Sequence, residues 1–273
     1  MSEDLIPNIR TWLDEQGYPL EMKVARNFQE AGFSVYISEY YLDPDEKKPR
    51  EIDVIASMKA KFSGVTFELA FAVECKSSKE SPWVCFRSGR KLQREPSVGF
   101  RARHATVLGR HLLTEISCDP DITTGKLFHL PDEYAYGVKN ALKKGVDLPY
   151  QAIVGANKAS EALIAHYDRI QKQPQPVHTV CIAFPLVIVD TSLFNCELGE
   201  GGDIHLSKTR SQTVLHTGFD TYYSIVEIVD ASALEDFIES KAELISNFLR
   251  RLPGRIPGTQ QQLQIANMMS EPD

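Results

Sequence analysis

Apolar and polar residues along this chain of 273 residues follow both helical and strand periods. Apolar positions three and four residues apart predict amphipathic helices, whereas short alternating or continuous apolar runs between turn residues predict strands. The predicted helices cover residues 2–16, 19–32, 132–144, 150–171 and 232–252. The predicted strands cover residues 33–41, 51–62, 65–76, 177–190, 192–198, 213–218 and 222–230. The interval 77–130 is polar and basic, and its pattern assigns no element.

Strands and helices alternate in part of the chain and follow one another in runs elsewhere, which predicts an α/β fold with a mixed sheet. Residues 1–252 contain no convincing linker and are expected to form a single domain. Its motif-bearing core covers residues 18–80, and the rest of the core with an extension of the sheet covers 132–252. Residues 253–273 are expected to be a disordered tail.

The predicted strands 51–62 and 65–76 are separated by Ser63 and Gly64, which suit a two-residue hairpin loop. In that register the even-numbered positions of the first strand pair apolar side chains with apolar side chains. These pairs are Phe62 with Val65, Ala60 with Phe67, Met58 with Leu69, Ala56 with Phe71, Val54 with Val73 and Ile52 with Cys75. On the other face Lys59 lies opposite Glu68, which is a favourable pair. A slip of one residue would lose both patterns, so the register is well specified.

The same register places Asp53 opposite Glu74, with Lys76 further along that face. Directly opposed side chains have Cβ atoms about 5 Å apart, and two carboxylates that close repel unless one is protonated or a cation lies between them. Ala70 and Ala72 precede Glu74 on this face, and their small side chains predict open space above the sheet. Oxygen ligands at a partly open site suit Mg²⁺.

A third acid, Glu21, lies on the predicted helix 19–32. At about 100° per residue it projects into the apolar arc, between Leu20 and Ala25. An acid in the first turn is favoured by the helix dipole, which is one reading of Glu21. The other reading is a carboxylate directed from the packed helix toward a metal ion.

Charge is distributed unevenly along the chain, although the whole carries a formal net charge of −7. Between residues 76 and 111 there are nine basic and two acidic side chains. A segment of this kind can contact phosphates, and a solvated basic loop is the equal alternative. The residues expected to bind nucleic acid are Arg87, Arg90, Lys91 and Arg94.

Composition adds little about function. The chain is 42% hydrophobic and 25% charged, as in ordinary globular proteins, and no apolar run approaches the roughly 20 residues of a membrane span. The N-terminus has no secretory-signal pattern, and the five scattered cysteines form no CxxC pair. We expect reduced cysteines, a cytoplasmic location and no membrane partner.

Glu21 on a helix, Asp53 on a strand and Glu74-Cys75-Lys76 on the next strand resemble the PD-(D/E)xK nuclease superfamily. The resemblance covers residues 18–80 and implies a restriction-endonuclease-like αβββαβ core, here with additional C-terminal strands and a terminal helix. The chain departs from the pattern at Ile52, where the motif often has proline.

The resemblance implies hydrolysis of phosphodiester bonds with Mg²⁺ as cofactor and Mn²⁺ as an alternative. By position, Asp53, Glu74 and the backbone carbonyl of Cys75 would be metal ligands. Lys76 would position or activate the attacking water, and a lowered pKa would be needed for it to act as a base. Glu21 would be an auxiliary ligand. The implied catalytic residues are therefore Glu21, Asp53, Glu74 and Lys76.

Two further residues carry open alternatives. Some nucleases of this kind place a glutamine on the helix after the catalytic strand, which makes Gln151 a weak candidate for the site. Trp83 suits either base stacking or core packing, and core packing is the more common use.

These observations predict a Mg²⁺-dependent deoxyribonuclease, an endonuclease rather than an exonuclease, in genome defence or repair. The alternatives are a nuclease acting on RNA, and a catalytically inactive nucleic-acid-binding or scaffold protein that keeps the same fold. The expected partner is nucleic acid, with a second copy of the chain or a protein partner also possible on this pattern.

Overall fold

The computed structural model describes the chain with short gaps. The described residues are 5–43, 45–77, 81–88, 99, 103–123, 125–128, 131–142, 145, 147–174, 178–217 and 223–252. Of the predicted residues, Arg90, Lys91, Arg94 and the tail 253–273 lie outside these ranges.

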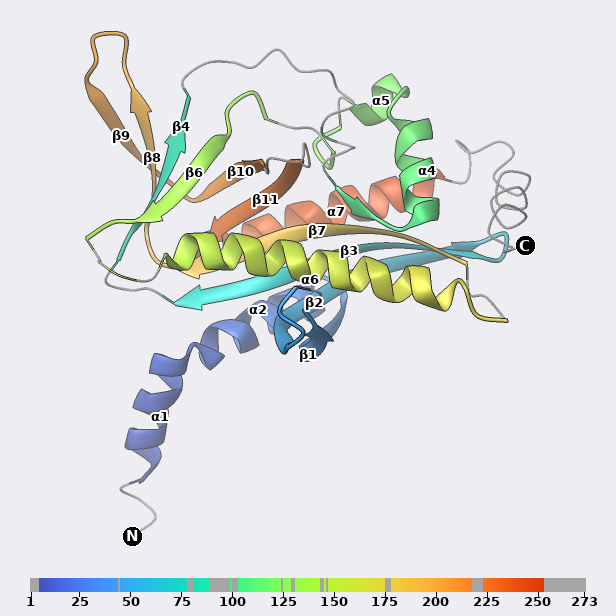
Figure 1. Ribbon diagram of the computed structural model, residues 1–273, viewed down its shortest axis with the longest axis horizontal. Helices are drawn as coiled ribbons and strands as arrows, with labels where there is room; N and C mark the ends of the chain where they lie inside the picture. Colours follow the sequence, from blue (N-terminus) through green and yellow to red (C-terminus); the bar gives the residue numbers. More distant parts are fainter. Residues whose placement is uncertain are drawn as a thin grey trace.

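The N-terminal part forms two helices and three long strands (Figure 1). Their bounds are α1 Leu5–Gln16, α2 Tyr18–Glu30, β1 Ser34–Leu42, β2 Pro49–Phe62 and β3 Val65–Ser77. All five were predicted, because their periodicity is clear and turn residues separate them. Gly17 stands between the two helices with φ of 85°, a left-handed conformation that favours glycine.

The middle of the chain is where prediction from the sequence was weakest. The described elements there are β4 Trp83–Arg87, β5 His104–Ala105, α4 Val107–Ile116, α5 Pro120–Thr123 and β6 Ala135–Asn140. The predicted helix 132–144 is wrong, since this segment contains the strand β6. Short apolar runs of this kind fit either period, and the neighbouring strands decide between them.

The C-terminal part follows the prediction closely. Its elements are α6 Leu148–Ile170, β7 Thr179–Asp190, β8 Leu193–Leu198, β9 Ile204–Thr209, β10 Ser211–Thr217, β11 Tyr223–Asp230, the 3₁₀ turn Ala231–Ala233 and α7 Leu234–Arg251. Only β9, which pairs with β8 as the second strand of a hairpin, was not predicted.

A single mixed sheet of eleven strands joins these elements in the described part of the chain. Its order is β1-β2-β3-β7-β11-β10-β6-β4-β8-β9, with β5 beside β7. β3 and β7 are parallel and pair over twelve residues, from Thr66 with Thr179 to Ser77 with Asp190. The fold is therefore a mixed α/β fold, as predicted.

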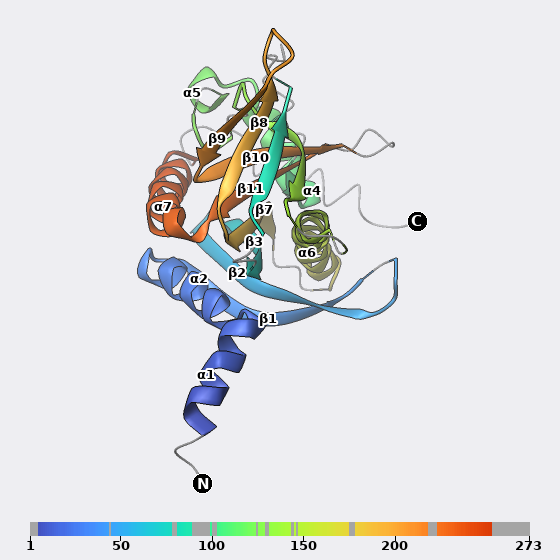
Figure 2. The same ribbon diagram turned by 90° about the vertical axis from the view of Figure 1, so that its left-hand side faces the viewer.

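Helices cover both faces of the sheet, and Figure 2 shows α7 and α6 on opposite sides of it. The larger apolar cluster lies on the α2 and α7 side and includes Phe28, Phe67, Phe71 and Ile238. On the other side α6 packs on Ala70 and Ala72 of β3 through Ile164 and Ala159. β1 and β2 curve around beneath α6 (Figure 2), whereas α1 extends away from the rest of the chain (Figure 1).

Candidate active site

The β2–β3 hairpin has the predicted register. Nine pairs run from Phe62 with Val65 to Val54 with Val73, and Lys59 lies opposite Glu68 as expected. The Lys59 Nζ and Glu68 Oε1 atoms are 3.2 Å apart. The regular ladder ends at Val54 and Val73, just before the acidic residues of the motif.

Asp53 departs from the predicted arrangement, because it lies beyond the last ladder pair rather than in a regular pair with Glu74. Its Oδ2 atom instead accepts a hydrogen bond of 2.7 Å from the backbone N–H of Cys75. Where two strands separate, backbone donors need new partners, and this carboxylate satisfies one of them. Ile52 likewise does not face Cys75 but packs with Ile55 on the α6 side.

Glu74 and Lys76 lie together on the face of β3 that α6 covers. Lys76 Nζ donates a hydrogen bond of 2.5 Å to Glu74 Oε1, and both side chains are mostly buried. The open space predicted above Ala70 and Ala72 is absent, since α6 fills it and both alanines are fully buried. Small side chains there allow the helix to approach the sheet closely.

The absence of a side chain at Gly155 of α6 leaves room for the Glu74 carboxylate. A Cβ atom added at this position would lie 3.0 Å from Glu74 Oε2 and 3.1 Å from its Cδ. Contacts this short force a neighbouring group to shift. The sequence contained one signal for this, a lone glycine inside a strong helical pattern, which often has a packing or functional reason.

Glu21 comes from the first turn of α2, on which Leu20 and Val24 are buried. Burial raises the pKa of Glu21 to about 7, and the negative charges of Asp53 and Glu51 add to the shift. Lys76 acts in the opposite direction on the same group. Glu21 therefore lies within electrostatic range of the motif residues of β2 and β3, although its position also suits a first-turn acid favoured by the helix dipole.

The nearby cations do not offset the effects of burial and mutual repulsion on Glu21, Asp53 and Glu74, so the pKa of each carboxyl group is raised. Burial, followed by the charge of Asp53, raises the pKa of Glu74 to about 7. Burial also raises the pKa of Asp53. Carboxylates in this condition hold protons more tightly than usual, and a bound cation would relieve their repulsion.

The pKa of Lys76 is raised in this structure, whereas the lowered pKa was expected beside a bound metal ion and stays a prediction. Burial alone would lower the pKa of the ammonium group, but the charges of Glu74 and Asp53 outweigh burial and raise it. In the metal-free chain Lys76 is therefore a cation at neutral pH, and not a base.

The donor set around these residues fits Mg²⁺. Within the described ranges no group of three or more His, Cys, Asp or Glu side chains is arranged to hold a metal ion. Mg²⁺ does not require such a group, because it keeps several waters and is usually held by one or two carboxylates together with substrate oxygens. Asp53 and Glu74 are two carboxylates of this kind, and burial raises the pKa of both.

Two other predicted residues are placed by the structure. Gln151 lies on α6 one turn before Gly155 and is exposed, so it is on the helix that covers Glu74. Trp83 is fully buried in the core, as the more common reading expected.

Arg87 is mostly buried and forms ion pairs with Glu133 and Glu197, the second at 3.0 Å. Its guanidinium group is thus already neutralised by two acids. The basic segment's other predicted phosphate contacts, which the structure does not describe, stay a prediction.

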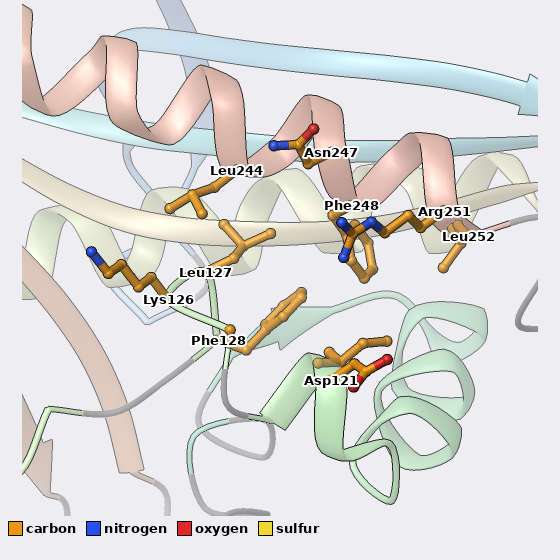
Figure 3. Close-up of a pocket in the computed structure, with 11 residues that line it drawn as sticks. Asp121, Lys126, Leu127, Phe128, Leu244, Asn247, Phe248, Arg251 and Leu252 are labelled. Carbon is orange, nitrogen blue, oxygen red and sulfur yellow. The ribbon is translucent and has the colours of Figure 1, made fainter.

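A pocket of about 180 Å³ lies on the other side of the sheet, where Figure 3 shows Leu244 and Phe248 of α7 near Leu127 and Phe128. Asp121 is the single carboxylate in the described lining. This apolar pocket shares no residue with the cluster of Glu21, Asp53, Glu74 and Lys76.

None of the helices in the described ranges is long and apolar enough to cross a membrane. Comparisons of the chain with protein-family models, with curated proteins and with solved structures found no match.

Proposed function

We propose that this chain is a Mg²⁺-dependent nuclease of the PD-(D/E)xK type, acting on DNA as an endonuclease. The observation that carries the proposal is the convergence of Glu21, Asp53, Glu74 and Lys76 from α2, β2 and β3. Asp53, Glu74 and Lys76 each shift the pKa of Glu21, so the four residues form one charged cluster. The order α2, β1, β2, β3, then α6 and β7, with β1-β2-β3-β7 adjacent in the sheet, supports a restriction-endonuclease-like core. The elements β4–β6, α4 and α5 would be an insertion in this core, and β8–β11 and α7 would be additions to it.

Asp53 and Glu74 would hold the ion, with the Cys75 carbonyl as a third protein ligand. When bound, Mg²⁺ supplies a nucleophilic water near neutral pH and neutralises charge on the phosphoryl oxygens. The Asp53 carboxylate is kept in place by the Cys75 N–H, and the Glu74 carboxylate by Lys76 and the surface of α6. Positioning of this kind keeps the ligands from reorganising during the reaction.

Lys76 contributes as a cation. Its raised pKa keeps it protonated, so it offsets the negative charge that grows on the phosphate as the new bond forms. Glu21 would orient a water beside the ion, since its carboxyl group with a pKa of about 7 can both accept and donate a hydrogen bond near neutral pH.

The test is cleavage of plasmid, linear and single-stranded DNA and of RNA, each with Mg²⁺, with Mn²⁺ and with EDTA. The variants Asp53→Asn and Lys76→Ala should each lose at least about 100-fold in rate while keeping the circular dichroism spectrum of the wild type. Matched controls are Glu235→Gln and Lys61→Ala, which change exposed charges away from the cluster and should cleave normally. Activity retained by Asp53→Asn would contradict the proposal.

The same assay separates the alternatives. Cleavage of RNA and not of DNA would favour the ribonuclease. Binding of either nucleic acid without cleavage under any of the metal conditions would favour the inactive scaffold. The five described cysteines are all free, which supports a cytoplasmic location as part of the proposal.

A further inference from the structure

A groove of about 650 Å³ lies between α6 and the strands β1 and β2, which curve beneath that helix (Figure 2). Its volume is within the range of known small-ligand sites. The groove reaches along α6 from Lys158 to Arg169, which is roughly 16 Å at the rise of an α-helix. That length matches two or three nucleotides of an extended strand.

One end of the groove adjoins the candidate active site. Ile52 lines the groove and directly precedes Asp53. Lys158 also lines it, and lies one turn of α6 beyond Gly155, which touches the Glu74 carboxylate. A ligand that fills the groove therefore ends beside the proposed metal ligands.

Tyrosines are the most prominent side chains of the lining. Tyr36, Tyr40 and Tyr41 come from β1, and Tyr167 comes from α6. Tyr36 is 51% exposed and Tyr40 is 66% exposed, and β1 is an edge strand of the described sheet. Exposed aromatic rings along a groove are the usual stacking platforms for unpaired bases.

Charges in the groove are already balanced. The described lining contains three carboxylates and three basic side chains. Lys59 is paired with Glu68, and Lys158 with Asp43 and Asp45 at 2.9 Å and 2.8 Å. With its lysines neutralised, the groove gains little from phosphates, so stacking has to supply the binding energy. A duplex keeps its base faces covered and cannot provide such contacts.

We propose that this groove binds single-stranded nucleic acid by stacking its bases on Tyr36 and Tyr40, and directs the strand to Asp53 and Glu74. The inference rests on the proposed nuclease function and specifies its substrate as a strand with an unpaired stretch.

The test is the binding of a fluorescein-labelled dT12 oligonucleotide, measured by anisotropy in EDTA so that no cleavage occurs. The double variant Tyr36→Leu/Tyr40→Leu keeps apolar side chains and removes the rings, and should bind at least about tenfold more weakly. Tyr36→Phe/Tyr40→Phe keeps the rings and should bind within about threefold of the wild type. Tyr136→Leu on β6, which replaces an equally exposed tyrosine outside the groove, should have no effect.

Salt dependence and duplex binding distinguish base stacking from contacts to phosphates. Because stacking releases few counterions, the Leu variant should keep the wild-type slope of affinity against salt. Its binding to a 12-base-pair duplex should be unchanged. Equal dT12 affinity of the wild type and the Leu variant, absence of dT12 binding by the wild type, or an equal loss on duplex would each overturn the groove proposal.

The experiments can reject the nuclease proposal or the groove proposal without rejecting the other. Tyrosine-dependent binding of dT12 without cleavage under any metal condition would support the groove and reject the nuclease. Metal-dependent cleavage together with dT12 binding that ignores the tyrosines would support the nuclease and reject the groove.

Discussion

Gly155 shows how the absence of one side chain can leave room for the carboxylate of a proposed metal ligand. The helix α6 lies close over β3, and the Glu74 carboxylate occupies the space where a Cβ would stand. Because the carboxylate also accepts a hydrogen bond from Lys76, it has little freedom to move aside. The proposed site therefore depends on a residue that contributes no chemistry of its own.

Gly155→Ala should separate activity from stability. Alanine favours the helix by up to about 1 kcal/mol, which offsets the cost of displacing the Glu74 carboxylate, so the melting temperature should change little. The displaced Glu74 carboxylate should lower the rate of metal-dependent cleavage by about 10- to 100-fold. Gly137→Ala is the control, since an added Cβ there meets nothing within 4 Å. Full activity in Gly155→Ala would show that Glu74 is not a metal ligand held by this contact.

The sequence pointed to Asp53, Glu74 and Lys76 because their spacing on a hairpin is a local property. It did not show that Asp53 bonds to the Cys75 backbone, since this follows from the end of the ladder and not from residue types. Nor did it show the ion pairs of Arg87, whose partners are distant along the chain. A count of basic residues cannot separate paired cations from free ones.

Among the elements, the register of the β2–β3 hairpin was predicted correctly over its nine ladder pairs, whereas β6 was assigned to the wrong class. The hairpin has a short turn and two strict alternating faces, so its sequence excludes other registers. β6 is short, and it becomes a strand by pairing with β4 and β10, neither of which is its neighbour in the chain. Such pairings are set by the tertiary structure. The hydrophobic period of a six-residue segment carries no information about them.

Asp43 follows the end of β1 and is ion-paired with Lys158 of α6. Its carboxylate is inaccessible to solvent and receives hydrogen bonds from Lys158 and from the backbone N–H groups of Asp45 and Glu46. Arg50 Nε lies 2.7 Å from the same carboxylate. The hydrogen bond from Lys158, followed by those from the backbone, holds the pKa of Asp43 well below its usual range.

This lowered pKa predicts a pH-dependent contribution to stability. A group whose pKa falls on folding stabilises the fold above its unfolded pKa of about 4, and the contribution is lost as the pH drops through the folded value. The wild type should thus be more stable than Asp43→Asn at pH 6, with the difference shrinking below about pH 4. Urea unfolding of both proteins between pH 3 and 7 measures this. A difference that is constant down to pH 3 would contradict the ion-pair account.

On the scale of the whole molecule, Phe71 connects four parts of the core. Its ring lies 5.6 Å and 6.0 Å from those of Phe28 and Phe33, 5.4 Å from Phe184 of β7, and 6.4 Å from Phe237 of α7. The side chain is fully buried. Ring contacts of this kind add to the stabilisation from the buried area.

Phe71→Ala should lower the free energy of unfolding by about 3–5 kcal/mol, since a large buried ring is lost and the neighbouring rings come from separate elements. Chemical denaturation monitored by circular dichroism measures the change. Tyr136→Ala removes an exposed ring and should change the stability by less than about 0.5 kcal/mol. A loss below about 1 kcal/mol in Phe71→Ala would mean that these rings do not form a tightly packed core.

The parallel pairing of β3 with β7 also has a consequence for the order of synthesis. All four residues of the proposed site leave the ribosome about a hundred residues before β7, the strand against which β3 is aligned. The nascent chain thus carries the motif long before it has the partner that holds β3 in the sheet. On the proposed function, cleavage would require a chain translated past residue 190, so a partly synthesised chain would leave the surrounding nucleic acid intact.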